Sequence, residues 1–147
     1  REARKQGVKQ PIIGETNVIS QKVIDLAGET AEGAKGHVGL TADAPIPAVQ
    51  EFTQKFQRRY KYVPDHNGLK GYMGVYAVKY ATEKLGKFDR KALAKLLHGL
   101  TITPKQEPGI LMETTWDAHG DIDRISFLVE VVKGRQKVVE VLPKLGK

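Results

Sequence analysis

Residues 8–14, Val-Lys-Gln-Pro-Ile-Ile-Gly, form a short apolar run bounded by a proline and a glycine. Such a run predicts a buried strand centred on Ile12 and Ile13. Residues 1–7, which precede it, have the basic side chains and the final glycine that are typical of a helix C-terminus. A helix, a tight turn and a strand make half of a βαβ unit. The sequence therefore predicts an α/β fold.

The rest of the chain continues this mixture of helices and strands. Helical periodicity predicts helices at residues 18–26, 47–60, 67–85 and 89–100, and apolar runs predict strands at residues 36–41, 110–116, 122–132 and 136–142. Tight turns at residues 117–121 and 133–135 make the C-terminal part a β-hairpin region. The glycines of the third helix, at positions 68, 71 and 74, lead us to expect close backbone packing there.

The composition excludes several classes of protein. The chain has 147 residues, with 24 Lys and Arg against 17 Asp and Glu, which gives a net charge of +7. No apolar run approaches the roughly 20 residues of a membrane span, which excludes a membrane-embedded chain. Cysteine is absent, so a disulfide scaffold and a thiol nucleophile are excluded.

Motifs for metal binding or catalysis are not found. The four histidines do not fall at metal-ligand spacings, and residues 117–123 lack the glycine position and final glutamate of a calcium loop. No phosphate-binding or serine-hydrolase motif occurs. The basic run from Lys55 to Lys61 is compatible with nucleic-acid binding, but without interleaved aromatics a solvated helix face is favoured. The sequence predicts no metal, no cofactor and no nucleic-acid partner.

Two short stretches are candidate sites. Glu15, Thr16 and Asn17 follow the first predicted strand, and ligands of open α/β sheets collect at the carboxyl ends of strands. These three residues are equally suited to capping the next helix. Tyr72 follows Gly71 near the start of the helix at 67–85, where an aromatic side chain either packs in the core or contacts a ligand.

Several stretches, taken in order, resemble one known family. They are Arg1-Glu-Ala-Arg-Lys-Gln-Gly-Val-Lys-Gln-Pro11, Ile13-Gly14, Leu26-Ala-Gly-Glu-Thr-Ala-Glu-Gly33, Phe56 and Tyr60 with Pro64, Tyr76-Ala77, and Thr115-Trp-Asp-Ala-His-Gly-Asp121. In order and spacing they are similar to the C-terminal portion of periplasmic leucine/isoleucine/valine-binding proteins, the type I substrate-binding proteins of ABC importers.

The resemblance implies a two-lobe fold with Rossmann-like lobes, a hinge of crossing strands and a ligand held between the lobes. Residues 1–42 would be part of the second lobe. Residues 43–124 would be the helical part of the first lobe, and residues 125–147 would return to the second. On this alignment the chain is a piece of a larger protein, and the loops that hold the ligand carboxylate lie outside it.

The resemblance also implies ligand-binding residues. In the family's amino-acid binders an acidic residue after the first strand receives the ligand ammonium, and the gap-free alignment puts Thr16 there, with Glu15 one place earlier. If Glu15 does not reach the ligand, the ligand would lack an ammonium group. The segment that contains Gly71 and Tyr72 matches the region that packs against the apolar part of the ligand.

The function that follows from the resemblance is binding without catalysis. The protein would bind a branched-chain amino acid or a related small carboxylate and deliver it to ABC permease subunits. It would act in the periplasm, or outside the cell as a lipid-anchored protein in a single-membrane bacterium. The alternative is a ligand-sensing regulatory domain of the same fold. Because strand edges would be exposed without the remaining lobes, we expect the 147-residue chain to self-associate.

Overall fold

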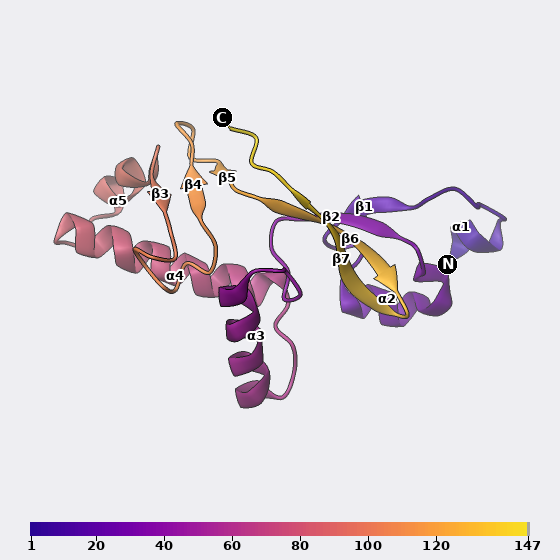
Figure 1. The fold of residues 1–147 in the computed structure, drawn as a ribbon. Coiled ribbons are helices and arrows are strands. Elements are labelled where there is room, and N and C mark those ends of the chain that lie inside the picture. The colour runs from indigo at the N-terminus through magenta and orange to yellow at the C-terminus, as the bar shows by residue number, and fades with distance from the viewer. Residues whose placement is uncertain (147) are drawn as a thin grey trace.

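The computed structural model describes residues 1–146, and two bodies lie end to end in it (Figure 1). The sheet body consists of α1 (Glu2–Lys5), β1 (Ile13–Glu15), α2 (Gln21–Ala27), the 3₁₀ helix η1 (Gly28–Ala31), β2 (Lys35–Val38), β6 (Ser126–Val132) and β7 (Arg135–Leu142). The helical body consists of α3 (Pro47–Tyr60), α4 (His66–Leu85), α5 (Arg90–Leu97), β3 (Thr101–Ile102), β4 (Thr114–Trp116) and β5 (Ile122–Asp123). Residues 39–46, 124–125 and 143–146 cross between the bodies, so the chain passes from one to the other three times (Figure 1).

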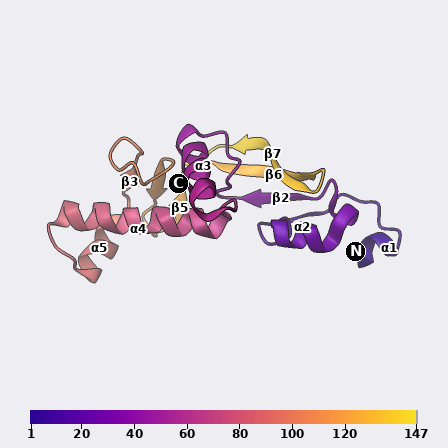
Figure 2. The same ribbon diagram turned by 90° about the horizontal axis from the view of Figure 1, so that it is seen from below.

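The sheet body is built on a mixed sheet with strand order β1-β2-β6-β7. β1 and β2 are parallel, whereas β2, β6 and β7 pair antiparallel. Along β6 buried and half-buried residues alternate, and Phe127, Val129 and Val131 are buried. Period-two burial of this kind means that one face of the sheet is covered and the other is not. The covering side chains include Ile19 and Ile24, from α2 and the loop before it; Figure 2 shows α2 beside the sheet.

The first strand corrects a sequence-based prediction. Ile12 and Ile13 were expected at the centre of a buried strand, but Ile13 is 72% exposed and Ile12 is half-buried. The expectation was wrong because β1 lies at the edge of the sheet, where its only partner among the described strands is β2. An apolar run alone does not distinguish an edge strand from a central one.

Three predicted helices of the helical body are confirmed. α3 has Pro47 at its first turn, where the missing N–H costs nothing. Asp65 caps α4 by accepting a hydrogen bond from the Gly68 N–H at 2.8 Å, and Asp89 caps α5 through the Ala92 N–H at 3.0 Å. α4 packs against α3 through aromatic rings: the centroids of Phe52 and Tyr72 lie 4.4 Å apart.

The predicted strands are confirmed in part. β2 ends at Val38, three residues before the predicted end, because the chain then leaves the sheet for the helical body. Residues 110–112 are buried but only 114–116 form a strand, and the run 122–132 is split into β5 and β6 by the second crossing segment. The short strand β3 was not predicted. The turn at residues 117–121 joins β4 and β5 as an antiparallel hairpin, as predicted.

Two details of the helices differ from what the sequence pattern suggests. In α2, which corresponds to the helix predicted at residues 18–26, Ile24 is the buried residue, whereas Val23 and Leu26 are exposed. Close packing at Gly71 and Gly74 is also absent, since a Cβ added at either position would meet no atom within 4 Å. Both glycines face open space along α4. Within residues 1–146 no helix combines the length and the apolar character that a membrane span requires.

Candidate functional site

Two cavities lie where the sheet body meets the helical body. One, of about 750 Å³, includes Arg124 in its lining, and the other, of about 740 Å³, includes Thr16. We call them the Arg124 cavity and the Thr16 cavity. Both volumes fall in the range of about 300–1,000 Å³ that small-molecule sites occupy. Both also lie near the carboxyl ends of the parallel strands β1 and β2, the usual place for ligands in open α/β sheets.

The two cavities lie on opposite sides of the first crossing. His37 and Gly39 line the Arg124 cavity, whereas Val38 and Leu40 line the Thr16 cavity. Successive side chains of an extended chain point to opposite faces, which explains the alternation. A ligand in one cavity is therefore separated from the other by the backbone of residues 37–40.

The Thr16 cavity is lined by polar groups of both bodies. From the sheet body come Thr16, Ser20 and Gln21, and from the helical body come Thr53 and Gln57. Thr16 donates a long hydrogen bond of 3.4 Å from its Oγ1 to the carbonyl of His37. Ser20 donates to the carbonyl of Asn17 at 3.1 Å, so the segment after β1 forms a hydrogen-bonded turn that leads into α2.

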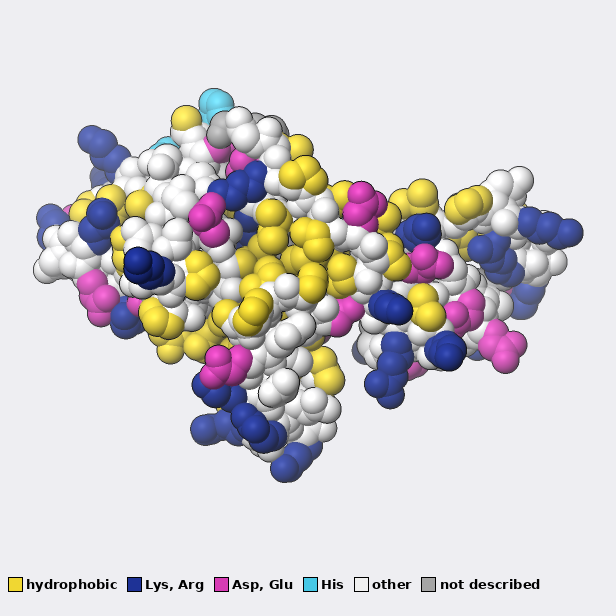
Figure 3. Space-filling view, in the orientation of Figure 1, with side chains coloured by type: hydrophobic (Ala, Val, Ile, Leu, Met, Phe, Trp, Pro, Cys, Tyr) yellow, Lys and Arg dark blue, Asp and Glu magenta, His cyan; other side chains and the backbone are white. Residues whose placement is uncertain are grey.

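The Arg124 cavity is walled mainly by apolar side chains. The apolar part of its lining includes Met73, Ala77, Ile110, Trp116, Ile122, Leu142 and Leu145. Figure 3 shows a continuous field of hydrophobic side chains in the middle of the molecule, where the two bodies meet. Four charged residues also line this cavity: Lys70, Asp123, Arg124 and Lys144.

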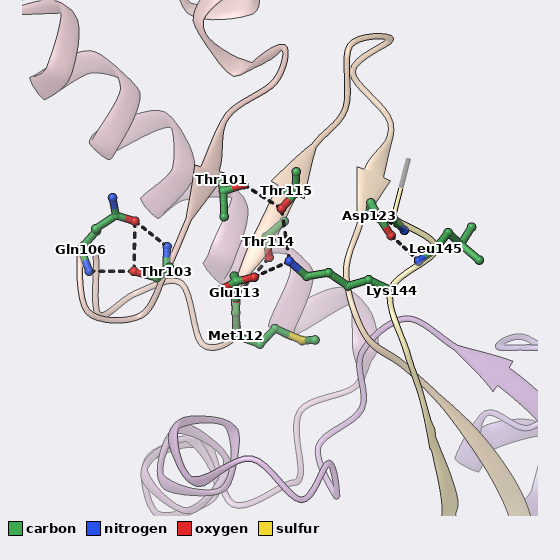
Figure 4. A network of polar contacts seen from close by, with 11 residues as sticks. Thr101, Thr103, Gln106, Met112, Glu113, Thr114, Thr115, Asp123, Lys144 and Leu145 are labelled. Atoms are coloured by element: carbon green, nitrogen blue, oxygen red, sulfur yellow. Dashed lines mark hydrogen bonds and ion pairs between the residues drawn. The ribbon is translucent and has the colours of Figure 1, made fainter.

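Two of those four charged groups have protein partners (Figure 4). Lys144 forms an ion pair with Glu113, and the carboxylate of Asp123 accepts hydrogen bonds from the backbone N–H groups of Leu145 and Gly146 at 2.9 and 3.0 Å. These contacts bind the third crossing segment to the helical body. Among residues 1–146, Arg124 and Lys70 are the two charged side chains of this cavity for which no ion pair is found.

Arg124 lies on the second crossing and is half-buried. Among residues 1–146 its guanidinium has no ion-pair partner and no hydrogen-bond acceptor, and burial lowers its pKa below the usual value. A Cβ added at Gly39 would lie 3.7 Å from its Nη2, so the guanidinium sits beside the backbone of the first crossing. Arg124 thus presents an unpaired cation to an apolar cavity.

The structure places Glu15 and Thr16 on opposite faces of the sheet. Glu15 pairs with His37 in the parallel β1–β2 ladder and shares its face, which is the face of the Arg124 cavity. Thr16, the next residue, lines the other cavity. Glu15 is exposed and does not itself line either cavity. The two candidates therefore cannot serve one ligand in the same way.

Tyr72 lies on α4, in the helical body. Its half-buried ring packs between Phe52 and Tyr76, with centroid distances of 4.4 and 4.8 Å. Burial, with smaller contributions from Tyr76 and Glu107, raises the pKa of Tyr72 to about 12. Gly71 is exposed on α4, and neither residue lines a junction cavity, although Lys70 and Gly74 on either side of them line the Arg124 cavity.

Sequence reasoning missed Arg124 and His37. In the predicted strand 122–132 a single arginine has the alternating position of an ordinary solvated side chain, so it gave no signal. His37 forms a 2.9 Å hydrogen bond between its Nε2 and the Oγ of Ser126, which joins β2 to β6 on the Arg124 side. Within the described part of the chain, no group of three or more His, Cys, Asp or Glu side chains is arranged to hold a metal ion.

Comparison with known proteins identifies the fold and the family. The fold is α/β and matches part of the type I periplasmic binding protein fold. A family model described as periplasmic binding protein matches residues 1–136, and the chain belongs to that family. A search of curated proteins found no significant match.

Solved structures support the same fold. The leucine-binding protein LivK of Thermotoga maritima is 21% identical with a TM-score of 0.82, over 97% of this chain and 40% of that one. A solute-binding protein of an ABC transporter from R. palustris, solved with benzoate, is 17% identical with a TM-score of 0.78, over 99% of this chain and 40% of that one. A putative branched-chain amino acid ABC transporter protein from Rhodospirillum rubrum is 24% identical with a TM-score of 0.68, over 95% of this chain and 40% of that one. The chain thus spans 40% of the length of these three proteins.

Proposed function

We propose that the chain is the C-terminal portion of the ligand-binding subunit of an ABC importer, which binds branched-chain amino acids or related small carboxylates between two lobes. The observation that carries the proposal is the pair of cavities at the junction of two bodies that three chain crossings connect. The names of similar structures, a leucine-binding protein and a benzoate complex, support these two ligand classes.

In this proposal the sheet body belongs to one lobe and the helical body to the other. Residues 1–42 and 125–147 form part of the second lobe, and residues 43–124 form the helical part of the first. Glu15 or Thr16 faces the polar group of the ligand. Gly71 and Tyr72 contribute the part of α4 that packs beside its apolar portion.

The proposed role requires binding and release rather than catalysis. The partners are the ligand and the permease subunits, and the protein acts in the periplasm or, lipid-anchored, outside a single-membrane cell. The basic face of α3 is better explained as a solvated surface than as a nucleic-acid site. Lys55 pairs with Glu51 at 2.6 Å, and the Arg59 guanidinium lies 5.6 Å from the ring centroid of Tyr60.

Calorimetry of the full-length protein tests the proposal. Leucine, isoleucine, valine and a panel of aliphatic and aromatic carboxylates are titrated, and we expect at least one of them to bind with a micromolar Kd. The 147-residue chain alone should bind the same ligand at least about a hundredfold more weakly, because it lacks most of the contacts that offset immobilisation. No binding of any of these compounds by the full-length protein would contradict the proposal.

We further propose that the 147-residue chain self-associates through its open sheet edge. Within residues 1–146 β1 pairs with β2 alone, and its Ile13 side chain is largely exposed. Free strand edges and exposed apolar side chains favour pairing between chains. Sedimentation at tens of micromolar should show a dimer or larger species, and Ile13→Lys should shift it toward the monomer. A monomeric parent chain would refute this.

A further inference from the structure

The second and third crossings run side by side between the two bodies. On the sheet side they begin as a paired ladder, in which Ser126 of β6 lies opposite Leu142 of β7. The next residue, Pro143, has no backbone N–H and cannot continue the ladder. On the helical side the two crossings are joined again, by the carboxylate of Asp123 (Figure 4). The side chain of Asp123 thus replaces a pairing that the backbone does not make.

The contacts of Asp123 suit this role. Asp123 is the last residue of β5 and is buried, and its Oδ1 and Oδ2 accept hydrogen bonds from the backbone N–H groups of Leu145 at 2.9 Å and Gly146 at 3.0 Å. We call these two bonds the Asp123 clamp. Bonds to an ionised carboxylate are stronger than neutral ones. A second link, the ion pair between Lys144 and Glu113, is partly exposed, and such pairs contribute little.

The segments between the clamp and the sheet are short. Arg124 and Ile125 separate β5 from β6, and Pro143 and Lys144 lie between the end of β7 and the first clamped amide. The proline ring fixes one backbone torsion of the second segment. Hinge motions are absorbed by a few residues at the ends of elements. Along these two crossings, a change in the angle between the bodies must therefore be absorbed by these four residues.

We propose that Asp123 is a positioning residue, which joins the second and third crossings into one two-stranded hinge and so limits the orientations of the two bodies around the ligand. The proposal rests on the proposed function, since a ligand held between two lobes enters and leaves when the lobes separate. With the clamp in place the two crossings bend together. Without it the third crossing bends separately, and the ligand-free protein samples more orientations. A smaller fraction is then competent to bind, and the apparent Kd rises in inverse proportion.

Distances between spin labels in the full-length protein test the clamp without any ligand. Lys22→Cys and Lys95→Cys place the labels at exposed positions of α2 and α5, one in each body. Asp123→Ala should broaden the distribution of label distances. Asp121→Asn, which removes an exposed carboxylate from the same hairpin, is the matched control and should leave the distribution unchanged. Identical distributions in Asp123→Ala and the parent would overturn the proposal.

Calorimetry with leucine, valine and benzoate gives a second readout in the same variants. Asp123→Ala should raise the Kd of every probe that binds by one common factor of about threefold to tenfold, because the competent fraction falls whatever the ligand. At saturating probe the label distances should return to those of the parent. Losses that differ severalfold between probes would mean that Asp123 contacts the ligand itself, which would overturn the proposal.

Asp123→Asn keeps the test decisive if Asp123→Ala does not fold. The asparagine side chain has one acceptor oxygen, so it should retain one of the two bonds and give an intermediate broadening. The same distribution in Asp123→Asn and Asp121→Asn would overturn the proposal. If the full-length protein binds none of the wider panel, the proposed function fails, and the label distances without ligand still decide whether Asp123 joins the crossings.

Discussion

The sheet body and the helical body bury their apolar side chains in different ways. In the sheet body one face of β6 supplies Phe127, Val129 and Val131 to the core, and the opposite face stays half-buried. In the helical body the contact between α3 and α4 is a row of aromatic rings, in which Tyr72 lies 4.4 Å from Phe52 and 4.8 Å from Tyr76. One-sided burial follows a simple alternation, whereas the aromatic row depends on how individual rings fit.

The helical body should therefore be the more sensitive to a single added methyl group at a close contact. A Cβ at Gly109 would lie 2.0 Å from the Tyr76 ring, which Tyr72 holds from another side. A Cβ at Gly36, in the sheet body, would lie 2.5 Å from Cγ1 of the buried Ile19. We expect Gly109→Ala to lower the free energy of unfolding by about 3 kcal/mol and Gly36→Ala by about 2 kcal/mol, since overpacking costs 1–3 kcal/mol or more.

Urea unfolding of both variants measures the difference. The same experiment shows whether the bodies unfold together, because the buried side chains form one continuous cluster across the junction. If the cluster couples the bodies, both variants should shift a single transition. Two transitions, each shifted by one variant only, would show that the bodies are independent units. A loss under 1 kcal/mol for Gly109→Ala would mean that the aromatic row adapts freely.

The difference between the two bodies also explains which elements could be predicted from the sequence. Helices α3, α4 and α5 are marked by local chemistry, namely Pro47 at a first turn and the caps Asp65 and Asp89, and sequence reasoning placed them within a few residues. The exposure of Ile13 is a property of sheet order, because β1 becomes an edge only when the neighbours of the whole sheet are known. Local pattern carries no such information.

The candidate site was likewise predicted where local pattern suffices and missed where the tertiary arrangement decides. Glu15 and Thr16 were identified correctly as residues at the carboxyl end of a strand, but which of them faces which cavity depends on their register with β2. Arg124 was missed because its position beside Gly39, at the junction of the two bodies, depends on the tertiary fold, which the local sequence pattern does not reveal. The ligand assignments of Glu15, Thr16, Gly71 and Tyr72 stay predictions.

The next prediction concerns how the stability of the helical body depends on pH. Glu107 is almost fully buried in the helical body, and it accepts hydrogen bonds from Lys79 Nζ at 2.7 Å and the Gly109 N–H at 3.1 Å. The bond from Lys79, followed by that from Gly109, lowers the pKa of Glu107. A lowered pKa means that the stabilisation is present above the ordinary carboxyl pKa and is lost as the pH falls through the folded-state value.

We expect Glu107→Gln to lower the free energy of unfolding by about 1–2 kcal/mol at pH 7, as for a hydrogen-bonded charged group. At pH 3 or below its difference from the parent should shrink. Urea unfolding at several pH values between 7 and 2 measures both quantities. Glu83→Gln is the matched control: Glu83 binds the same Lys79 Nζ at 3.1 Å but is exposed, so its effect should be smaller. Parallel pH profiles for parent and Glu107→Gln would contradict the assignment.

The smallest expected effect on the free energy of unfolding is at two glycines of α4. Gly71 and Gly74 both face open space, so Gly71→Ala and Gly74→Ala should each raise the free energy of unfolding by about 0.5–1 kcal/mol through helix propensity. Gly86→Ala, at the end of the same helix with φ of +68°, should destabilise instead. The proposed function places Gly71 beside the apolar portion of the ligand, so in the full-length protein Gly71→Ala should also weaken the bound ligand severalfold. Calorimetry measures this loss, with Gly74→Ala as the equally stabilised comparison. An unchanged affinity in Gly71→Ala would contradict the assignment of Gly71 to the binding site.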